Sequence, residues 1–567
     1  MLPELATIAT IRHASPAMGC SLPFPVSLTM PVGPGNRYPT TGAAETARLQ
    51  DEPTGRRVRR HCGGNMVNLH RLFLLIWILS FCTQLNVPDV AMAAEDVIEE
   101  PPRQTPVIAQ ADVVVIGGGL GGVGAALAAA RSGAKTILIE RSGYPGGWLR
   151  GAGLGNVLAI NGWRPRLDEG VLLEITRKVV ELAAEGYPNV ESAVKRGQLE
   201  VTNHEILPHA FQSMLVEAGM QILYFSTYAG SVVKDNRIQA VLIQTHVGRA
   251  AVRGKVFIDC TGLATVAAES GAPVRQQEAL MGLACWIGPV DVPRYQAYEA
   301  SLPKMPDPEA RRWLESKIGV PVTTFEPRDP LPQGAMDYKW EAWLERQANV
   351  LGPKFREAVD RGEMPLLYRI GRQGRVGMVE GLKVGYSQVS GGVARPRTYI
   401  VGVDPTDIRQ LTEAHIKSTQ YLFKLAEFLR KHIPGFEKAQ VLRIAEMTLN
   451  RAGRSITNDA GPDDFDDVER PTHHPDAIAI LQRGPDKGAY EVPYSTMLPQ
   501  GIQNLLAVGK SSSGGWMFRT HMLSVVMGQA AGTAAAIAVR DGVLPGQIDI
   551  AKLQAELRAA GVPIPQR

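Results

Sequence analysis

The sequence has neither the strong positive charge typical of nucleic-acid-binding proteins nor the paired cysteines typical of cysteine-based metal sites. Its 60 basic and 56 acidic residues give a formal net charge of only +4, so charge offers no case for nucleic acid as a partner. Five cysteines are present and none forms a CxxC pair, and the sequence therefore predicts no cysteine-based metal site. Cys260 and Cys285 could pair in an oxidising compartment. Cys260 follows an apolar run, however, so we expect a buried free thiol.

A long hydrophobic segment is also missing. The most apolar stretch, residues 72–79, is too short to span a bilayer as a stable anchor. Arg71 precedes it and Ala91, Met92 and Ala93 follow it, which supplies the basic, apolar and small-residue parts of a secretory signal. We expect residues 66–93 to be a signal peptide cleaved after Ala93, and the protein to be exported, periplasmic or secreted. Membrane contact is then expected only through this segment, as a signal or as an uncleaved anchor.

Residues 1–65 are rich in Pro, Gly, Ser and Thr and show no sustained periodicity. We interpret them as a disordered, over-extended start, with Met66 as the true first residue. Peptides from before Met66 in mass spectrometry would contradict this hypothesis. Four arginines leave export by the twin-arginine route open, although they lie far from the apolar run: Arg56, Arg57, Arg59 and Arg60.

Residues 111–140, ADVVVIGGGLGGVGAALAAARSGAKTILIE, carry the strongest motif of the chain. An apolar run at 113–116, a glycine-rich turn, an alanine-rich helical pattern at 123–131 and a second apolar run form a strand, turn, helix, strand unit. Gly117, Gly119 and Gly122 occupy the GxGxxG positions, where glycine allows a tight turn, the approach of a pyrophosphate and close helix packing. Glu140, 23 residues after Gly117, stands where an acceptor for ribose hydroxyls belongs. The unit predicts a dinucleotide-binding fold.

The segments that follow predict an α/β fold with a small antiparallel layer. Amphipathic patterns at 167–185 and 206–218 predict helices. Strand-like runs occur at 221–225, 231–233, 238–244 and 256–259, with a turn at Asp235 and Asn236. The last run rejoins the parallel sheet and ends at Thr261 and Gly262, where open α/β sheets bind ligands.

Residues 273–402 lack βα alternation and are rich in Trp, Arg and Pro, so we interpret them as part of a separate substrate or cap domain. Asp404 and Pro405 predict the N-cap and first turn of a helix that ends at Pro434. We expect one of its faces to be core, with His415 on that face beside Ile408, Leu411, Leu422, Leu425 and Leu429. Residues 463–470 predict a solvated loop. His473 and His474 lack partners at metal spacing, so no metal is expected.

A second strand, loop and helix near the end of the chain requires a reason. Residues 505–508 predict a buried strand, Gly509 begins a loop, and residues 526–540 predict a small-residue helix. FAD supplies the reason, because it is longer than one βαβ unit can cover. A helix that begins near Met527 would direct its positive end at the flavin O2 and N1 region.

Four blocks resemble the FAD-dependent oxidoreductase family of the glutathione-reductase-like, two-dinucleotide-binding-domain flavoproteins. They are VVVIGGGLGGVGAALAAARSGAKTILIERSGYPGG, VFIDCTGLATVAAESGAP, VGVDPTDIRQLTEAHI, and NLLAVGKSSSGG with MGQAAGTAAAIA. The resemblance implies the fold and FAD, but no particular substrate. Two departures stand out. Leu263, Ala264 and Thr265 lie where such proteins commonly have an acidic residue, and Lys510 stands where an arginine often occurs.

The expected architecture is a Rossmann-like FAD/NAD(P)-binding domain with an inserted substrate or cap domain. Its parts are a linker at 94–110, the FAD-binding domain at 111–272 and 441–545, the substrate or cap domain at 273–440, and a tail at 546–567. The residues expected to hold FAD are Gly117, Gly119, Leu120, Gly121, Gly122, Glu140, Arg141, Gly146, Gly147, Thr261, Gly262, Gly509, Gly528, Gln529 and Ala530.

Two residues between the flavin loop and the last helix are the catalytic candidates. Arg519 could hold a carboxylate or polarise a carbonyl, and His521 could act as an acid or base near neutral pH. A structural role for both is equally open, and Arg451, Arg454 and Tyr494 are weaker candidates.

We expect an exported oxidoreductase that transfers a hydride equivalent between flavin and a small organic substrate, with an unknown electron acceptor. Two alternatives remain at this point. One is a non-redox flavoenzyme, an isomerase or lyase acting on carbohydrate, and the other is a non-catalytic binding module.

Overall fold

The computed structural model describes most of the chain from residue 98 onward. The described residues are 98–153, 156–158, 163–164, 167–183, 189–200, 203, 205–277, 280–302, 308–318, 352–365, 380–387, 391–462, 470–483 and 489–564. Pro101–Arg567 form one compact unit, separate from Met1–Glu100. The leader, the signal peptide and the cleavage site expected from the sequence lie outside the described residues.

A five-stranded parallel sheet, in the order β21-β11-β2-β3-β7, organises the larger unit. Alternate side chains of its strands enter two different cores. Val113 and Val115 of β2 pack with the helices on one face, and Val114 and Ile116 pack with an antiparallel sheet on the other. Burial on both faces explains the continuous apolar runs of the sequence, and it confirms the expected α/β, Rossmann-like fold. The strands are β2 (Val113–Ile116), β3 (Thr136–Ile139), β7 (Gln221–Leu223), β11 (Val256–Asp259) and β21 (Leu505–Ala507).

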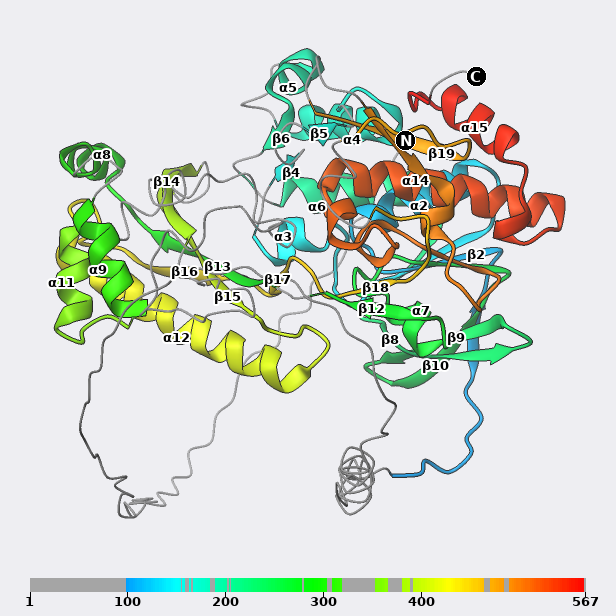
Figure 1. Ribbon diagram of the computed structural model, residues 1–567, viewed down its shortest axis with the longest axis horizontal. Helices are drawn as coiled ribbons and strands as arrows, with labels where there is room; N and C mark the ends of the chain where they lie inside the picture. Colours follow the sequence, from blue (N-terminus) through cyan, green and yellow to red (C-terminus); the bar gives the residue numbers. More distant parts are fainter. Residues whose placement is uncertain are drawn as a thin grey trace, which may run out of the picture. The chain divides into compact units, whose positions relative to one another are not determined.

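Two helices rich in small residues cover the first face and lie against each other (Figure 1). They are α2 (Leu120–Arg131) and α14 (His521–Asp541). A Cβ on Gly124 would lie 2.4 Å from the carbonyl oxygen of Val525, and one on Gly532 would lie 2.1 Å from that of Ala125. The two backbones therefore touch, which only residues without a side chain allow.

The prediction that the last helix begins near residue 526 is wrong, because α14 begins at His521. Its sequence is apolar around the whole circumference, so periodicity carries no signal for the first turn. Among the described residues, α14 is the one helix long and apolar enough to cross a membrane by length and composition. It is largely buried in the protein, as core helices that meet these criteria are.

An antiparallel sheet in the order β1-β10-β9-β8 covers the second face. It consists of β1 (Val107–Gln110), β8 (Thr227–Lys234), β9 (Arg237–Thr245) and β10 (Gly248–Arg253). Asp235 and Asn236 form the predicted turn, with φ of 51° and 57°. The end of the expected linker is a strand, since β1 pairs with β10. The run at 221–225 does not join this layer, because β7 pairs in parallel with β3.

The region after residue 273 has a core of its own. Its sheet has the order β14-β15-β13-β16, with β17 beside β13, and the long helix α12 lies across it (Figure 1). Asp407 caps α12 by accepting hydrogen bonds from the N–H groups of Arg409 and Gln410, so the expected N-cap at Asp404 is wrong. The elements are β13 (Leu280–Gly288), α8 (Val292–Ser301), α9 (Pro308–Ile318), α11 (Pro353–Asp360), β14 (Glu380–Ser387), β15 (Gly391–Val401), α12 (Ile408–His432), β16 (Gln440–Ile444) and β17 (Leu449–Asn450).

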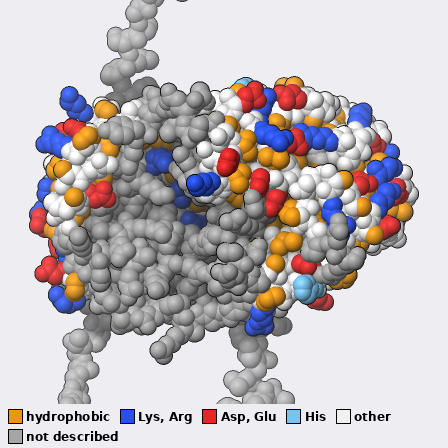
Figure 2. All heavy atoms as spheres, turned by 90° about the horizontal axis from the view of Figure 1, so that it is seen from above, with side chains coloured by type: hydrophobic (Ala, Val, Ile, Leu, Met, Phe, Trp, Pro, Cys, Tyr) orange, Lys and Arg blue, Asp and Glu red, His pale blue; other side chains and the backbone are white. Residues whose placement is uncertain are grey.

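The other described elements pack around these layers. They are α3 (Trp148–Gly151), β4 (Asn156–Leu158), β5 (Trp163–Arg164), α4 (Gly170–Leu182), α5 (Val190–Arg196), β6 (Gln198–Glu200), α6 (Ile206–Glu217), α7 (Thr265–Glu269), β12 (Val274–Gln276), β18 (Arg454–Ile456), β19 (Ala477–Arg483), β20 (Ala489–Pro493), η2 (Tyr494–Met497), η3 (Gly509–Ser511), η4 (Gly515–Arg519), η5 (Pro545–Gln547) and α15 (Ile550–Ala559). On the face seen in Figure 2, acidic and basic side chains are mixed over the described surface.

Candidate functional site

A cavity of about 1170 Å³ opens at the carboxyl ends of the parallel strands. The strands of the sheet line it with the residues at or just past their last positions, which are Ile116, Glu140, Cys260 and Val508. The opposite wall comes from the first turns of α12 and from the segment between β16 and β17. The cavity thus lies where open α/β sheets bind ligands and extends to the second antiparallel region.

The glycine loop after β2 forms the floor of one end. Gly117 has φ of +101°, and a Cβ there would lie 2.6 Å from the carbonyl oxygen of Cys260. A Cβ on Gly122 would lie 1.8 Å from the carbonyl oxygen of Gly117. A Cβ on Gly119 would meet no atom within 4 Å, and Gly119 lines the cavity. Two glycines are therefore required by packing, whereas Gly119 keeps the cavity itself clear.

The doublet at Gly146 and Gly147 completes this loop. Gly146 donates a hydrogen bond from its N–H to the carbonyl of Gly118 at 2.7 Å, and a Cβ on Gly147 would lie 3.2 Å from the Cα of Gly119. Both glycines have positive φ, at 103° and 49°. Residues 28 positions apart in sequence thus build one stretch of backbone beside the cavity.

Glu140 lies at the end of β3 and is buried, with 6% of its surface exposed. Its Oε2 accepts a hydrogen bond from the N–H of Gly118 at 2.6 Å, and its Oε1 accepts one from Ser142 at 2.7 Å. Each carboxylate oxygen can accept more than one hydrogen bond. Glu140 therefore fixes the glycine loop and still offers acceptors to a ligand in the cavity.

Asp259 fixes the turn after β11 and joins it to the loop after β21. Its Oδ1 accepts from the N–H and hydroxyl of Thr261, and its Oδ2 accepts from the N–H of Ala267. The hydroxyl of Ser511 donates to Asp259 and accepts from the N–H groups of Gly262 and Ala264. The sequence pattern did not identify the link between Asp259 and Ser511, because the two residues lie 252 positions apart.

Both catalytic candidates line the same cavity. Arg519 is the last residue of η4 and is buried. His521 is the first residue of α14, whose N-cap, Thr520, makes no side-chain capping hydrogen bond. The positive end of this 21-residue helix therefore meets the cavity at His521 and not, as expected, near Met527.

The sequence from residue 112 to residue 557 matches a family model described as FAD dependent oxidoreductase. The chain belongs to this family. An FAD-dependent oxidoreductase is an enzyme, and its cofactor is FAD. The family resemblance of the four sequence blocks is thereby confirmed. No curated protein matches the sequence.

The solved structures similar to this FAD-dependent oxidoreductase include the following three. A geranylgeranyl bacteriochlorophyll reductase-like protein from Thermoplasma acidophilum has 13% identity, with 80% of this chain and 83% of that chain covered and a TM-score of 0.37. p-Nitrophenol 4-monooxygenase from Pseudomonas putida has 11% identity, with 80% of this chain and 84% of that chain covered and a TM-score of 0.36. A myxobacterial chondrochloren halogenase has 10% identity, with 80% of this chain and 79% of that chain covered and a TM-score of 0.38.

The residues around the cavity of this oxidoreductase fit FAD. The N-cap of α2, Gly119, has no side chain to occupy the first-turn N–H groups, which leaves them to a phosphate. The Oδ1 atom of Asn450, which lines the cavity, is buried without a hydrogen-bond partner, and a buried acceptor of this kind calls for a donor from a ligand. Eleven of the expected FAD residues line the cavity, namely Gly117, Gly119, Leu120, Gly121, Glu140, Arg141, Gly146, Gly147, Thr261, Gly262 and Gly509.

Three expected FAD residues lie elsewhere, in the interior of α14. A Cβ on Gly528 would lie 2.1 Å from the carbonyl oxygen of Gly121. The side chain of Gln529 accepts a hydrogen bond from the N–H of Val171 at 2.9 Å, and Ala530 is fully buried. These residues hold α14 against its neighbours and do not line the cavity. Gly122 is also absent from the lining, because it serves the close packing that the GxGxxG pattern requires.

The weaker catalytic candidates do not line the cavity either. The hydroxyl of Tyr494 donates to the carbonyl of Pro545 at 2.9 Å, and Arg454 Nε donates to the carbonyl of Leu263 at 3.0 Å. Arg451 is buried, with 9% of its surface exposed. His415 lines the cavity and does not join the core of α12.

The two cysteines of the described residues are free thiols, as expected. Burial raises the pKa of each thiol well above its usual value, and the charge of Asp259 adds to this for Cys260. Cys260 lines the cavity and is partly exposed, whereas Cys285 is buried. Among the described residues, no group of three or more His, Cys, Asp or Glu side chains is arranged to hold a metal ion.

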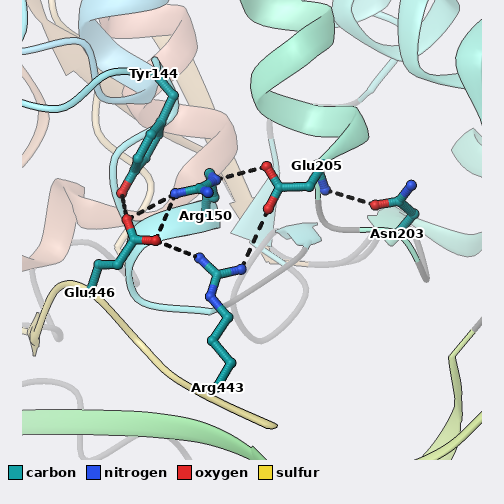
Figure 3. Close-up of polar contacts among 6 residues, drawn as sticks. All are labelled: Tyr144, Arg150, Asn203, Glu205, Arg443 and Glu446. Atoms are coloured by element: carbon teal, nitrogen blue, oxygen red, sulfur yellow. Dashed lines mark hydrogen bonds and ion pairs between the residues drawn. The ribbon is translucent and has the colours of Figure 1, made fainter. Parts of the chain in front are cut away.

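A ring of four charges lies at the edge of the cavity (Figure 3). Arg150 contacts Glu205 and Glu446, each at 2.8 Å. Arg443 contacts the same two carboxylates at 3.4 and 3.0 Å. The hydroxyl of Tyr144 donates to Glu446 at 2.6 Å. The ring joins α3 and the start of α6 to the end of β16, and the sequence offered no signal for it.

Proposed function

We propose that this enzyme transfers a hydride equivalent between a small organic substrate and FAD, and that it acts outside the cytoplasm. One observation carries the redox part of the proposal. A single cavity contains both the glycine-lined cradle for FAD and the pair Arg519 and His521. At about 1170 Å³ it exceeds the roughly 300–1,000 Å³ of ordinary ligand pockets. This size supports a cofactor and a substrate side by side.

The residues of the chain divide this work. The glycine loop, Glu140 and the turn at Thr261 would hold FAD, which supplies an acceptor or donor of a hydride equivalent when bound. Arg519 orients a carbonyl or carboxylate of the substrate through its fixed guanidinium geometry. His521 takes or gives the proton that accompanies the transfer, and the N-terminus of α14 favours negative charge beside it.

The wall opposite the glycine loop indicates the character of the substrate. Ile408 and Ile416 of α12 line the cavity, with 71% and 50% of their surfaces exposed, and Leu411 lies between them in sequence. Exposed aliphatic side chains at a cavity wall favour a ligand with an apolar part. His415 adds a polar group to the same wall. We therefore propose an organic substrate that combines an apolar portion with a polar reacting group.

Anaerobic mixing tests the redox proposal. The FAD-loaded enzyme is mixed with a panel of alcohols, amines and acids that carry an apolar portion, and the visible flavin absorption is followed. Bleaching by one class, with loss of at least tenfold in its rate in Arg519→Met and His521→Asn, supports the proposal. Full bleaching by dithionite combined with turnover of a compound without bleaching would contradict it and favour the non-redox alternative.

Export rests on the sequence of residues 66–93 alone, and a fractionation experiment tests it. The full chain with a C-terminal tag is followed in the cytoplasmic, membrane and exported fractions of its host. We expect the exported fraction to contain a chain whose N-terminus lies near residue 94. A chain of full length confined to the cytoplasm would overturn the proposal of export.

A further inference from the structure

Lys510 is a buried amine in the wall of the cofactor cavity. It lies in η3, directly after β21, and only 7% of its surface is exposed. It lines the cavity together with Gly262, whose added Cβ would lie 3.7 Å from Lys510 Cε. The amine lies 4.8 Å from the centre of the Trp148 ring. The sequence marked this position only as a departure from the family.

The partners of the amine are carbonyl oxygens. Lys510 Nζ donates to the backbone carbonyl of Asn450 at 2.6 Å and to that of Ala452 at 3.2 Å. It has no carboxylate partner among the described residues. A neutral amine has two N–H groups and a lone pair, whereas an ammonium has three N–H groups. Two carbonyls therefore satisfy every donor of the neutral amine and leave one position at nitrogen for a lone pair or a proton.

The surroundings lower the cost of losing the proton. Burial lowers the pKa of Lys510 to about 7, and repulsion from Arg519 adds to the effect. An ordinary lysine would stay charged several pH units higher. The amine can thus change its protonation state near neutral pH without any change in its two carbonyl hydrogen bonds.

Other charged or titratable groups lie on the elements around Lys510, and two of them are held by the partners described above. Arg150 on α3 is held by Glu205 and Glu446. Asp259 on β11 is held by backbone N–H and hydroxyl groups. The remaining groups on the neighbouring elements are Cys260, Arg451, Arg454, Arg519 and His521. Arg519 is the charged group that contributes to the shift of Lys510.

We propose that Lys510 is a second proton-carrying residue of the site, beside His521, and that it takes up a proton when bound FAD is reduced and releases it on reoxidation. The inference rests on the proposed function, since it requires FAD to cycle in this cavity. A hydride equivalent brings two electrons and one proton, so reduction leaves one negative charge in the cavity. Uptake of a proton from solvent, R–NH2 + H⁺ → R–NH3⁺, cancels that charge beside the cofactor.

This role predicts a definite pH dependence of FAD reduction. Negative charge in the cavity raises the pKa of Lys510, since an opposite charge favours the ammonium. Below pH 7 the lysine is already protonated in both redox states. Between pH 7 and the raised pKa, reduction takes up a second proton. The equilibrium constant for reduction therefore changes by a further tenfold per pH unit in this window, which is about 30 mV for a two-electron couple.

The experiment is the midpoint potential of the FAD-loaded full chain between pH 5.5 and 9, measured by equilibration with redox dyes. We expect a slope of one proton per two electrons below pH 7 and of two protons above it. Lys510→Met is expected to keep one proton per two electrons throughout. Lys510→Arg, whose charge does not titrate, should show the same single slope with a higher potential than Lys510→Met. Lys424→Met, on the exposed side of α12, is the matched control and should retain the wild-type profile.

Two results would overturn the inference. One is a single slope in the wild-type enzyme, and the other is an unchanged two-proton window in the Lys510 variants. If Lys510→Met fails to bind FAD, Lys510→Arg decides the question. His521→Asn identifies the carrier in the second case, because loss of the window there would assign the proton to the histidine. Failure of every organic substrate to bleach the flavin would remove the proposed function while leaving this readout intact.

Discussion

Gly528 and Gly121 stand so close that a Cβ on Gly528 would lie 2.1 Å from the carbonyl oxygen of Gly121. The contact joins the middle of α14 to the first turn of α2, the helix that begins at the cofactor cradle. Gly528, which belongs to the last of the four sequence blocks, therefore helps to set the position of α2 and of the cofactor cradle at its N-terminus.

We predict that Gly528→Leu destabilises the protein by about 1–3 kcal/mol, the usual cost of overpacking. FAD affinity should fall as well, because α2 must move away. Urea unfolding and FAD titration measure the two effects. Gly546→Ala is the control, since its Cβ would meet Leu498 at an ordinary 3.9 Å, and its free energy of unfolding should change by less than about 0.5 kcal/mol. Equal stability of both variants would contradict the helix contact.

A second prediction concerns the carboxylate of Glu140, which accepts two backbone N–H groups. In Glu140→Gln one of these N–H groups faces an amide NH2 and loses its acceptor. We expect a loss of about 1–3 kcal/mol in the free energy of unfolding, the cost of a buried unsatisfied donor. Urea unfolding without added FAD measures it. The exposed Glu427→Gln on α12 should have no comparable effect, and an unaltered Glu140→Gln protein would show that the loop does not depend on this carboxylate.

A third prediction concerns pH and the charge ring. Burial raises the pKa of Glu446, but the hydrogen bond from Tyr144 and the charges of Arg150 and Arg443 outweigh it and lower the pKa overall. A lowered folded-state pKa gives stability that is present above the unfolded-state value of about 4.3 and is lost as pH falls through the folded-state value. Half-exposed ion pairs contribute about 0–1 kcal/mol, less at high salt.

We therefore expect Glu446→Gln to be slightly less stable than wild type at pH 7 in low salt. The difference should shrink in 1 M salt and vanish as the pH falls below 4. Urea unfolding at each combination of pH and salt checks the prediction, with Glu427→Gln as control. If the stability difference between Glu446→Gln and wild type grew as the pH fell, its sign would be opposite to the prediction, and the charge ring could not be its cause.

Local patterns predicted the first half of the cofactor site well. The run from β2 to β3 is recovered within three residues, since glycine spacing, apolar runs and Glu140 all lie within 30 residues. Capping was less reliable, because Asp404 and Asp407 both precede α12 at plausible positions. Asp404 instead accepts from the N–H of Thr406 in a turn.

The remainder of the site depends on contacts that no local pattern records. Arg150 and Glu446 are 296 positions apart, and Lys510 finds its carbonyl partner 60 positions earlier. The strand β1 forms only because β10 lies beside it. Such pairs depend on how the whole chain folds. The sequence therefore predicted the cofactor, but only the structure showed that Lys510, Asn450 and His415 line the same cavity.

Gly119 provides the most direct test of the central claim that this cavity holds FAD. A side chain there enters open space and costs the protein no packing, but it fills the cradle. FAD content per chain is measured from the visible absorption and from the flavin released or retained on denaturation, in wild type and in Gly119→Leu. We predict about one FAD per wild-type chain and less than about a tenth of that in the variant, with unchanged circular dichroism. Equal FAD in both proteins would contradict the account.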